Sequence, residues 1–414
     1  MLASWQHLAL AWAETGHKTL PLDGWSVIMT KACLESNIAE AKMHALLRAT
    51  LAGRATLAFS LVENPSLKIG QQDVGTILRL AFNALAVPDL SYLDALTDGK
   101  FDVCRPLMQI ILVCLNRLDR TKDRHSGLLD LFEAIVAKGA TNLLNRARIS
   151  ADEQVAEMVK LVIAIAQNLV DLSSRDIIFS ELCNKLMDHN TIEAAVRLYG
   201  AGHQCLIDDQ PIFAELSLSF LVALCPIPRV PEQIAVAGIL AFVMESPISS
   251  VIQSNDIRTP NSLVLHRVWT RGVLPMIFSL LQSLGTRIIR DVVAFFRLYE
   301  HQIQSAFAEW ARPKFVTTAL VDETLLLLVL FEVVDTYLRM EQDRFVFRGK
   351  EDLLENVNNL LAHPRFLARL VHPTSVEEEK MMEERKEGEF KNALVAKVAA
   401  DLVEVRGLLG VVEQ

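Results

Sequence analysis

The chain has 414 residues, 51% of them apolar, and its 41 basic and 50 acidic side chains give a net charge of −9 at pH 7. A mean hydropathy of +0.28 excludes a disordered chain, and the acidic balance, without a stripe of Lys and Arg among aromatics, argues against nucleic-acid binding. Because one hydrophobic core rarely serves more than about 300 residues, this length predicts several domains or a repeat array.

Helical patterns begin near the N-terminus. Ser4–Glu14 is amphipathic and lacks a basic leader, so we expect a helix there and no signal peptide. A chain that starts within a helix and carries no targeting segment is expected to be a part of a larger protein. The six cysteines are scattered through helical patterns, which favours core thiols in a reducing compartment over a disulfide framework.

Helix starts can be read from capping boxes, in which a Ser hydroxyl and a Glu carboxylate each bond the other's backbone amide. Ser150 with Glu153 and Ser375 with Glu378 have this pattern. Behind the first box, apolar residues recur at helical spacing and predict one buried stripe. The stripe consists of Val155, Met158, Val159, Val162, Ala166 and Leu169.

Prolines from Pro21 to Pro373 divide the chain into helical patterns of ordinary length, and no run has the alternation of a strand. Many helices with short links predict an all-α fold, an irregular armadillo/HEAT-like α-solenoid in which helix pairs stack into a superhelix. Tetratricopeptide and ankyrin consensus residues are absent from the sequence. We expect residues 1–414 to form a single elongated solenoid.

One segment has the style of an armadillo/HEAT corner. Gly272 permits a tight turn, Pro275 suits the first turn of the next helix, and Trp269 is expected to fill the space before the corner. Gly272–Thr286 is also the longest run without Asp, Glu, Lys or Arg, and Leu325–Phe331 is more apolar. Both are shorter than the roughly 20 residues of a spanning helix, so we interpret them as buried and expect no membrane insertion.

Near the C-terminus a charged tract, Glu377–Glu389, leads into apolar residues at helical spacing: Leu394, Val398, Leu402 and Val405. This predicts one long helix over residues 374–409, solvated in its first half and docked as a terminal cap in its second. An acidic docking tail is the alternative interpretation.

The residues that could carry chemistry do not form a recognisable set. Cys183, His189, His203 and Cys205 lack the short paired spacings of zinc ligands, so we interpret them as core thiols and helix-end histidines and expect no metal. Gly200-Ala201-Gly202 lacks the third glycine of a dinucleotide loop and is expected to end a helix. Nucleophile-elbow, Walker and zinc-protease motifs are absent from the sequence, so neither an enzyme nor a cofactor is expected.

Two aromatic positions are candidates for partner binding. Phe345 and Phe347 lie among charges, between expected helices. They either anchor this loop to the solenoid or form part of a peptide groove. His266, next to Arg267 and close to Trp269, is the most site-like cluster of the chain, and we interpret it as a packed Trp with a polar neighbour.

The stretch Leu263–Gly285, with Leu265-His266-Arg267-Val268-Trp269, Gly272-Val273-Leu274-Pro275 and a final Gly285, resembles the C-terminal tail of the giant inner-ring scaffold nucleoporins. The nucleoporin-188 type fits better than its larger paralogue. The resemblance implies a nuclear-pore location at the nuclear envelope and a structural role in protein and mRNA transport. It also implies docking of a helical motif of the inner-ring linker nucleoporin, and weak contact with Phe-Gly repeats or transport factors.

Two functions therefore compete for this architecture. The first is a structural scaffold whose grooves hold partner helices or extended peptides. The alternative is a soluble, karyopherin-like transport receptor or adaptor that binds reversibly. A helical enzyme is a third class, disfavoured because no acid/base or nucleophile set converges.

Overall fold

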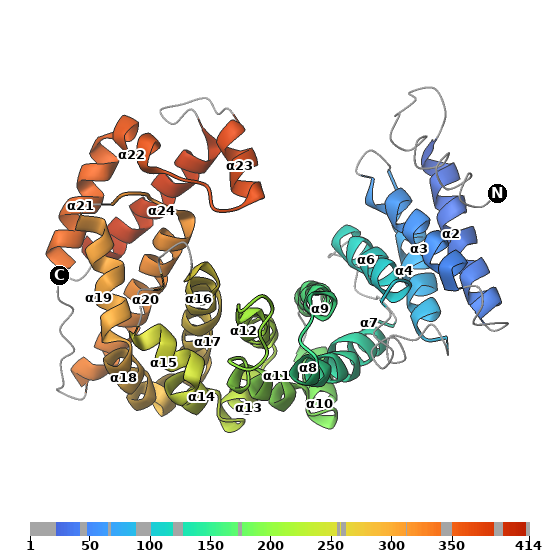
Figure 1. The fold of residues 1–414 in the computed structure, drawn as a ribbon, viewed down its shortest axis with the longest axis horizontal. Helices are drawn as coiled ribbons and strands as arrows, with labels where there is room; N and C mark the ends of the chain where they lie inside the picture. Colours follow the sequence, from blue (N-terminus) through green and yellow to red (C-terminus); the bar gives the residue numbers. More distant parts are fainter. Residues whose placement is uncertain are drawn as a thin grey trace. The chain divides into compact units, whose positions relative to one another are not determined.

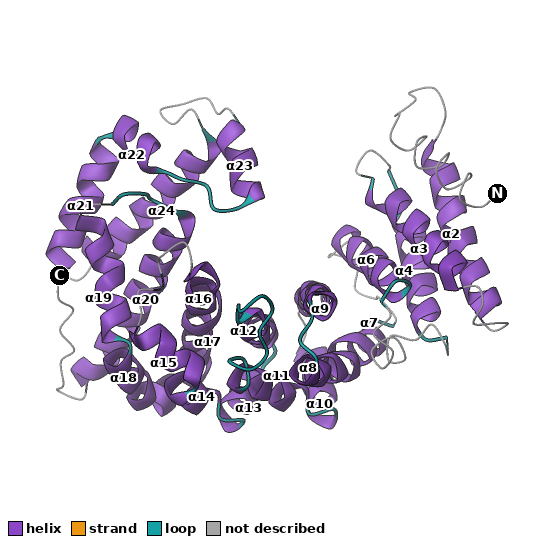
Figure 2. Ribbon diagram, viewed as in Figure 1, coloured by secondary structure: helices purple, strands orange, loops and turns teal. Residues whose placement is uncertain are grey.

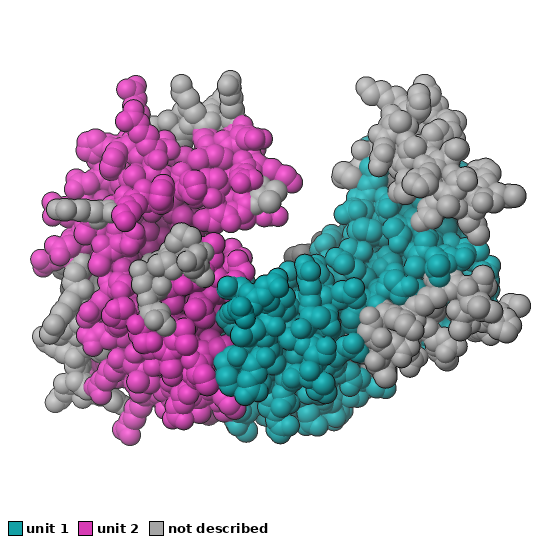
Figure 3. Space-filling model, viewed as in Figure 1, with its two compact units in different colours: residues 1–237 teal, residues 238–414 magenta. Residues whose placement is uncertain are grey.

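In the computed structural model, the described residues are 22–41, 48–64, 68–87, 101–118, 127–172, 176–254, 257, 262–311, 313–340, 350–384 and 392–410. Within these ranges every regular element is helical (Figure 2), and isolated bridges pair Ile207 with Gln210 and Val316 with Val371. The chain divides into two compact units, residues 1–237 and 238–414 (Figure 3). The segments with Ser4–Glu14, Phe345 and Phe347 lie outside the described residues.

In the first unit, consecutive helices pack side by side (Figure 1). α2 packs on α3 and α4, and both of these pack against α6. α6, α8 and α12 pack against α9, and α11 packs against α8 and α12. Each helix thus buries one face against neighbours close in sequence. The elements are α2 (Leu22–Ala41), α3 (Arg48–Glu63), α4 (Gln71–Leu85), α6 (Cys104–Arg117), α7 (Leu128–Leu131), the π-helix η2 (Phe132–Gly139), α8 (Ala140–Ile149), α9 (Glu153–Leu172), α10 (Asp176–Asp188), α11 (Thr191–Gly200), α12 (Ile212–Leu224) and α13 (Val230–Val236).

The predicted stripe of α9 is confirmed, because each of its six residues has at most 1% of its surface exposed. The expected cap is wrong by two positions. Asp152 accepts the backbone N–H of Val155 at 2.8 Å, and the helix begins at Glu153. Ser150 instead ends the preceding helix in an extended conformation. Asp and Ser are equally good N-caps, so local preference alone did not choose between them.

In the second unit α20 packs against α17, α18, α19 and α24, and α24 also packs against α21 and α23. The elements are α14 (Ile239–Glu245), α15 (Pro247–Ser254), α16 (Leu263–Arg267), the π-helix η4 (Val268–Val273), α17 (Leu274–Leu284), the 3₁₀-helix η5 (Gly285–Ile288), α18 (Ile289–Leu298), α19 (Glu300–Ala308), the 3₁₀-helix η6 (Glu309–Ala311), α20 (Thr318–Met340), α21 (Lys350–Ala362), α22 (Pro364–Leu370), α23 (Val376–Glu383) and α24 (Ala393–Gly410).

The helix–helix corner expected between Trp269 and Pro275 is wrong. The chain runs on from α16 through η4 into α17, and the N–H of Leu274 bonds to the carbonyl of Trp269, five residues back. A proline inside an α-helix lacks its N–H and clashes with the carbonyl four residues earlier. The wider π-turn just before Pro275 accommodates this defect without a corner.

The continuous stretch Leu263–Leu298 is long and apolar enough to cross a membrane by length and composition, since an 18-residue window in it has a mean hydropathy of 1.4. Half of that window is buried inside the fold, and Trp269 and Ile277 have no exposed surface. Gly285 interrupts it with a positive φ of 56°. A core helix meets the same criterion, and the burial of this stretch within its own unit identifies it as one.

The long terminal helix expected over residues 374–409 is wrong, because two helices form there. The Ser375 hydroxyl caps α23 as predicted, accepting from the N–H of Glu378 at 3.2 Å, and α23 ends at Glu383. Asn392 then caps α24, with its side-chain oxygen accepting from the N–H of Leu394 at 2.9 Å. The Asn392 amide also donates to the carbonyl of Met382, which fixes the reversal between the helices. A role for α24 as terminal cap stays a prediction.

Candidate functional site

The most site-like cluster of the sequence is a closed polar core in the second unit. Glu323, on α20, has no exposed surface. It accepts a hydrogen bond from the indole N–H of Trp269 at 2.7 Å and lies 3.0 Å from Nε2 of His266. Trp269 also stacks on Tyr299 with ring centroids 4.9 Å apart. The carboxylate thus faces two donors and buried aromatic rings, which makes it part of the core.

Trp269 is therefore packed, as predicted from the sequence. Its polar neighbour is Glu323, 54 residues away, rather than the adjacent Arg267. Sequence reasoning missed this partner because the contact joins two helices. The sequence contains one clue: Glu323 lies two residues before the apolar run Leu325–Phe331, and a carboxylate beside such a run needs a buried donor.

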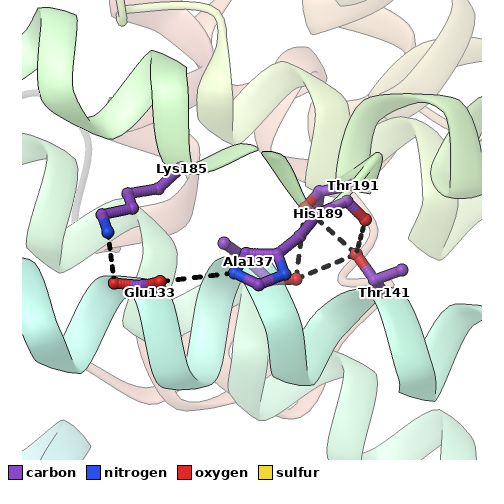
Figure 4. A network of polar contacts seen from close by, with 6 residues as sticks. All are labelled: Glu133, Ala137, Thr141, Lys185, His189 and Thr191. Atoms are coloured by element: carbon purple, nitrogen blue, oxygen red, sulfur yellow. Dashed lines mark hydrogen bonds and ion pairs between the residues drawn. The ribbon is translucent and has the colours of Figure 1, made fainter. Parts of the chain in front are cut away.

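A second polar network lies in the first unit, where α10 and η2 meet (Figure 4). Glu133 pairs with Lys185 at 2.6 Å and with Nε2 of His189 at 3.4 Å. The hydrogen bond from Lys185 holds the pKa of the Glu133 carboxyl below its ordinary value, although partial burial opposes this. His189 thus contacts a carboxylate on the neighbouring π-helix η2, and this contact helps to hold α10 and η2 together.

The other half of this network serves the π-helix. The carbonyl of Ala137 accepts from the hydroxyls of Thr141 at 2.9 Å and Thr191 at 3.1 Å (Figure 4). Thr191 is the first residue of α11, so its hydroxyl ties α11 to η2. π-turns break the regular backbone hydrogen bonds of an α-helix. Hydroxyl groups such as these supply additional donors to the carbonyls near the end of η2.

The four residues weighed as metal ligands have ordinary structural surroundings. Burial raises the pKa of the Cys183 thiol and of the Cys205 thiol, which disfavours the thiolate that binds metals. The His203 ring lies 3.1 Å from the side-chain nitrogen of Gln204. Over the described ranges, no three His, Cys, Asp or Glu side chains are placed to hold a metal ion. All six cysteines are free thiols.

A groove in the second unit is the strongest candidate for partner binding, and we call it the α21 groove. It has a volume of about 680 Å³ and is formed by the end of η6, one face of α21 and the start of α22. Its lining residues are Trp310, Ala311, Pro313, Asn356, Asn359, Leu360, His363 and Phe366. The sequence carried little signal for this groove because its walls come from separate elements.

Consecutive helices stack on one another, which defines an irregular α-solenoid of the armadillo/HEAT type, as predicted. An open groove with aromatic and amide side chains lies among these helices. Residues 78–409 match the family model Nup188_C, described as the nuclear pore protein NUP188 C-terminal domain. The chain belongs to this family. The family is that of a nuclear pore protein and is not an enzyme class.

Relatives agree with this assignment. The chain is 25% identical to nucleoporin nup184 of Schizosaccharomyces pombe over 350 residues, covering 81% of this chain and 22% of that protein. It is 25% identical to nucleoporin NUP188 of Saccharomyces cerevisiae over 323 residues, covering 68% and 19%. The chain thus spans about a fifth of the length of the curated relatives that it matches.

A solved structure shares the fold. Residues 1445–1827 of Nup188 from Myceliophthora thermophila superpose with a TM-score of 0.71 at 22% identity, covering 83% of this chain and all of that one. The family match over residues 78–409 confirms the resemblance of Leu263–Gly285 to the nucleoporin-188 type. Together with the relatives, it points to the nuclear pore complex as the location of the chain.

Proposed function

We propose that this domain acts in the inner ring of the nuclear pore as a docking surface for short helical or extended motifs of other nucleoporins. The observation that carries the proposal is the family match over residues 78–409 of an α-solenoid. Solenoids hold peptides in grooves between their helices. The α21 groove, with its apolar floor and amide-bearing wall, has the chemistry that such a motif requires.

The partner proposed first is a helical motif of the inner-ring linker nucleoporin, and weaker contact with Phe-Gly repeats or transport factors is proposed second. Direct nucleic-acid binding is not part of the proposal, because the chain carries a net charge of −9. Catalysis is not part of it either: the polar clusters of the described residues are tied into ion pairs, caps and buried hydrogen bonds.

Phe345 and Phe347 remain proposed contact residues. They follow α20 and precede α21, the helix that forms one wall of the α21 groove. Both interpretations of the pair stand, as anchors of their loop and as part of a peptide groove.

Retention in permeabilised cells tests the proposal. A fluorescent fusion of the full chain should stay at the nuclear rim after digitonin treatment and washing, because a scaffold domain exchanges slowly. Wash-out, together with binding to a small GTPase of the transport cycle, would favour the transport-receptor alternative and contradict the proposal. Family membership favours retention.

A further inference from the structure

The α21 groove has a rigid floor. Trp310 has no exposed surface, and its indole N–H donates to the Thr324 hydroxyl at 2.9 Å. That hydroxyl donates in turn to the carbonyl of Leu320 within α20. Leu360, beside Trp310 in the lining, is 4% exposed. A floor fixed by packing and hydrogen bonds is preorganised, so a ligand would not have to order it on binding.

One large aromatic side chain stands exposed in the groove. Phe366 lines it and is 53% exposed. The segment after the lining Pro313 is fixed beside α22, since the N–H of Val316 donates to the carbonyl of Leu370 at 2.8 Å. An exposed phenyl ring in a preformed groove offers apolar surface to a partner.

The wall from α21 presents two primary amides. Asn356 and Asn359 both line the groove, three residues apart on one helix face. Neither side-chain amide makes a hydrogen bond to another described residue. A primary amide offers both donors and an acceptor, which matches the N–H and C=O groups of a peptide backbone.

Three cations lie next to lining residues of the groove in the sequence. Lys314 follows Pro313, and Arg365 and Arg369 lie either side of Phe366 on α22. All three are exposed and form no ion pair with a described residue. The acidic residues next to the lining are Glu309, before Trp310, and Glu355, before Asn356. Three exposed cations beside one groove are a local feature in a chain of net charge −9.

We propose that the α21 groove binds an acidic peptide segment with a large apolar anchor, oriented with its acidic residues toward Lys314, Arg365 and Arg369. The anchor packs against Phe366, above the floor that the buried Trp310 supports, and the amides of Asn356 and Asn359 bond its backbone. The proposal rests on the docking function proposed above and specifies the chemistry of the partner. Charge complementarity selects an acidic partner, because Lys314, Arg365 and Arg369 attract carboxylates.

A selection from short random peptides displayed on phage, with the full chain as bait, tests this proposal. We expect enriched peptides to combine a Phe, Trp or Leu with clustered Asp and Glu. In fluorescence anisotropy, the double variant Arg365→Glu/Arg369→Glu should raise the Kd of such a peptide about tenfold, since exposed charges contribute a few-fold each. Phe366→Ala should raise it by about tenfold or more because anchor contacts dominate binding.

Matched controls in the same unit are Arg406→Glu for charge and Leu298→Ala for lost apolar surface; both side chains are exposed and outside the lining. These two variants should bind like wild type. The proposal is overturned if no peptide is enriched, if enriched peptides are basic or uncharged, or if the groove variants bind them normally. It is overturned too if light scattering shows that the groove is occupied by a second copy, as a dimer abolished by Phe366→Ala.

The rim-retention experiment separates this inference from the broader function. If the wild-type chain binds acidic peptides in the groove but washes out of permeabilised cells, the docking scaffold is wrong and the groove assignment stands. If the chain is retained but selects no acidic peptide, the scaffold stands and the groove assignment is wrong.

Discussion

Trp269 donates a 2.7 Å hydrogen bond from its indole nitrogen to Glu323, a carboxylate without exposed surface on a different helix. The bond joins the π-helix η4 to α20, the helix on which α17, α18, α19 and α24 pack. Burying a carboxylate is costly unless it has donors, so the hydrogen bond from Trp269 helps to keep Glu323 in the core.

Trp269→Ala should lower the free energy of unfolding by about 3–5 kcal/mol, through lost apolar burial and the cavity left behind. Trp269→Phe retains most of the ring but removes one donor to Glu323, so a loss of about 1–3 kcal/mol is expected. Urea melts followed by circular dichroism measure both. Every partner should weaken together in Trp269→Ala, because the helices lose a common support. If Trp269→Ala unfolds at the same urea concentration as wild type but loses a single partner, Trp269 lies in a binding site instead.

Thr191→Val should destabilise the first unit by about 1 kcal/mol, because it removes a buried hydroxyl that donates to the Ala137 carbonyl. Thr191→Ser keeps the hydroxyl and is the matched control. Hydrogen exchange should show faster exchange over η2 and the start of α11 in the Val variant only. Equal protection in both variants would mean that the hydroxyl does not stabilise the π-helix.

Asp401→Asn should raise the Tm at neutral pH. Partial burial raises the pKa of the Asp401 carboxyl, Lys397 opposes this, and Asp322 and Glu404 add to it. A folded-state pKa above the unfolded one means that the ionised carboxylate destabilises the fold at higher pH, and that protonation relieves this as the pH falls through the folded pKa. The gain in Tm should therefore shrink toward about pH 4, near the ordinary value of an Asp carboxyl. The exposed Glu332→Gln serves as control; a gain in Tm independent of pH would contradict the assignment.

A strong chelator should leave the Tm unchanged, because no structural metal is expected at Cys183, His189, His203 and Cys205. Structural zinc contributes directly to the free energy of folding, so its removal would be visible in a melt. A drop of several degrees, restored by added zinc, would revive this set as a site.

The double variant Phe345→Ser/Phe347→Ser distinguishes the two interpretations of this pair. If the rings line a groove, the Tm should stay near that of wild type while one partner is lost. If they anchor their loop to the solenoid, the Tm should fall and all partners should weaken. A variant with an unchanged Tm and unchanged binding would remove both residues from the list of contacts.

Local sequence patterns predicted the helices but not the way in which they join. The α9 stripe from Val155 to Leu169 and the Ser375 cap follow from spacing and from one hydroxyl, so the sequence determines them. The corner at Gly272–Pro275 was predicted wrongly, because a proline also fits a helix that widens into π-turns. The end of α23 was missed, because we interpreted the charged tract as part of one long helix. Asn392, an ordinary N-cap residue, was therefore not recognised as the start of a second helix.

The candidate sites depend on contacts between distant parts of the chain. Glu323 meets Trp269 from 54 residues away, and the α21 groove combines Trp310 with Asn356 and Phe366. Neither arrangement leaves a short motif, because the contributing side chains are divided among separate elements. The family resemblance of Leu263–Gly285 could be recognised from the sequence since this segment is a continuous core helix.

Quantitative affinity purification tests the central claim, docking of other nucleoporins in the α21 groove, most directly. Wild-type chain, Phe366→Ala and Leu298→Ala would be compared as baits in nuclear-envelope extract, with partners quantified by mass spectrometry. We predict that nucleoporins dominate the wild-type and Leu298→Ala samples and fall several-fold with Phe366→Ala. Equal recovery of nucleoporins by all three baits would contradict docking in this groove, and their absence from the wild-type sample would contradict the docking function itself.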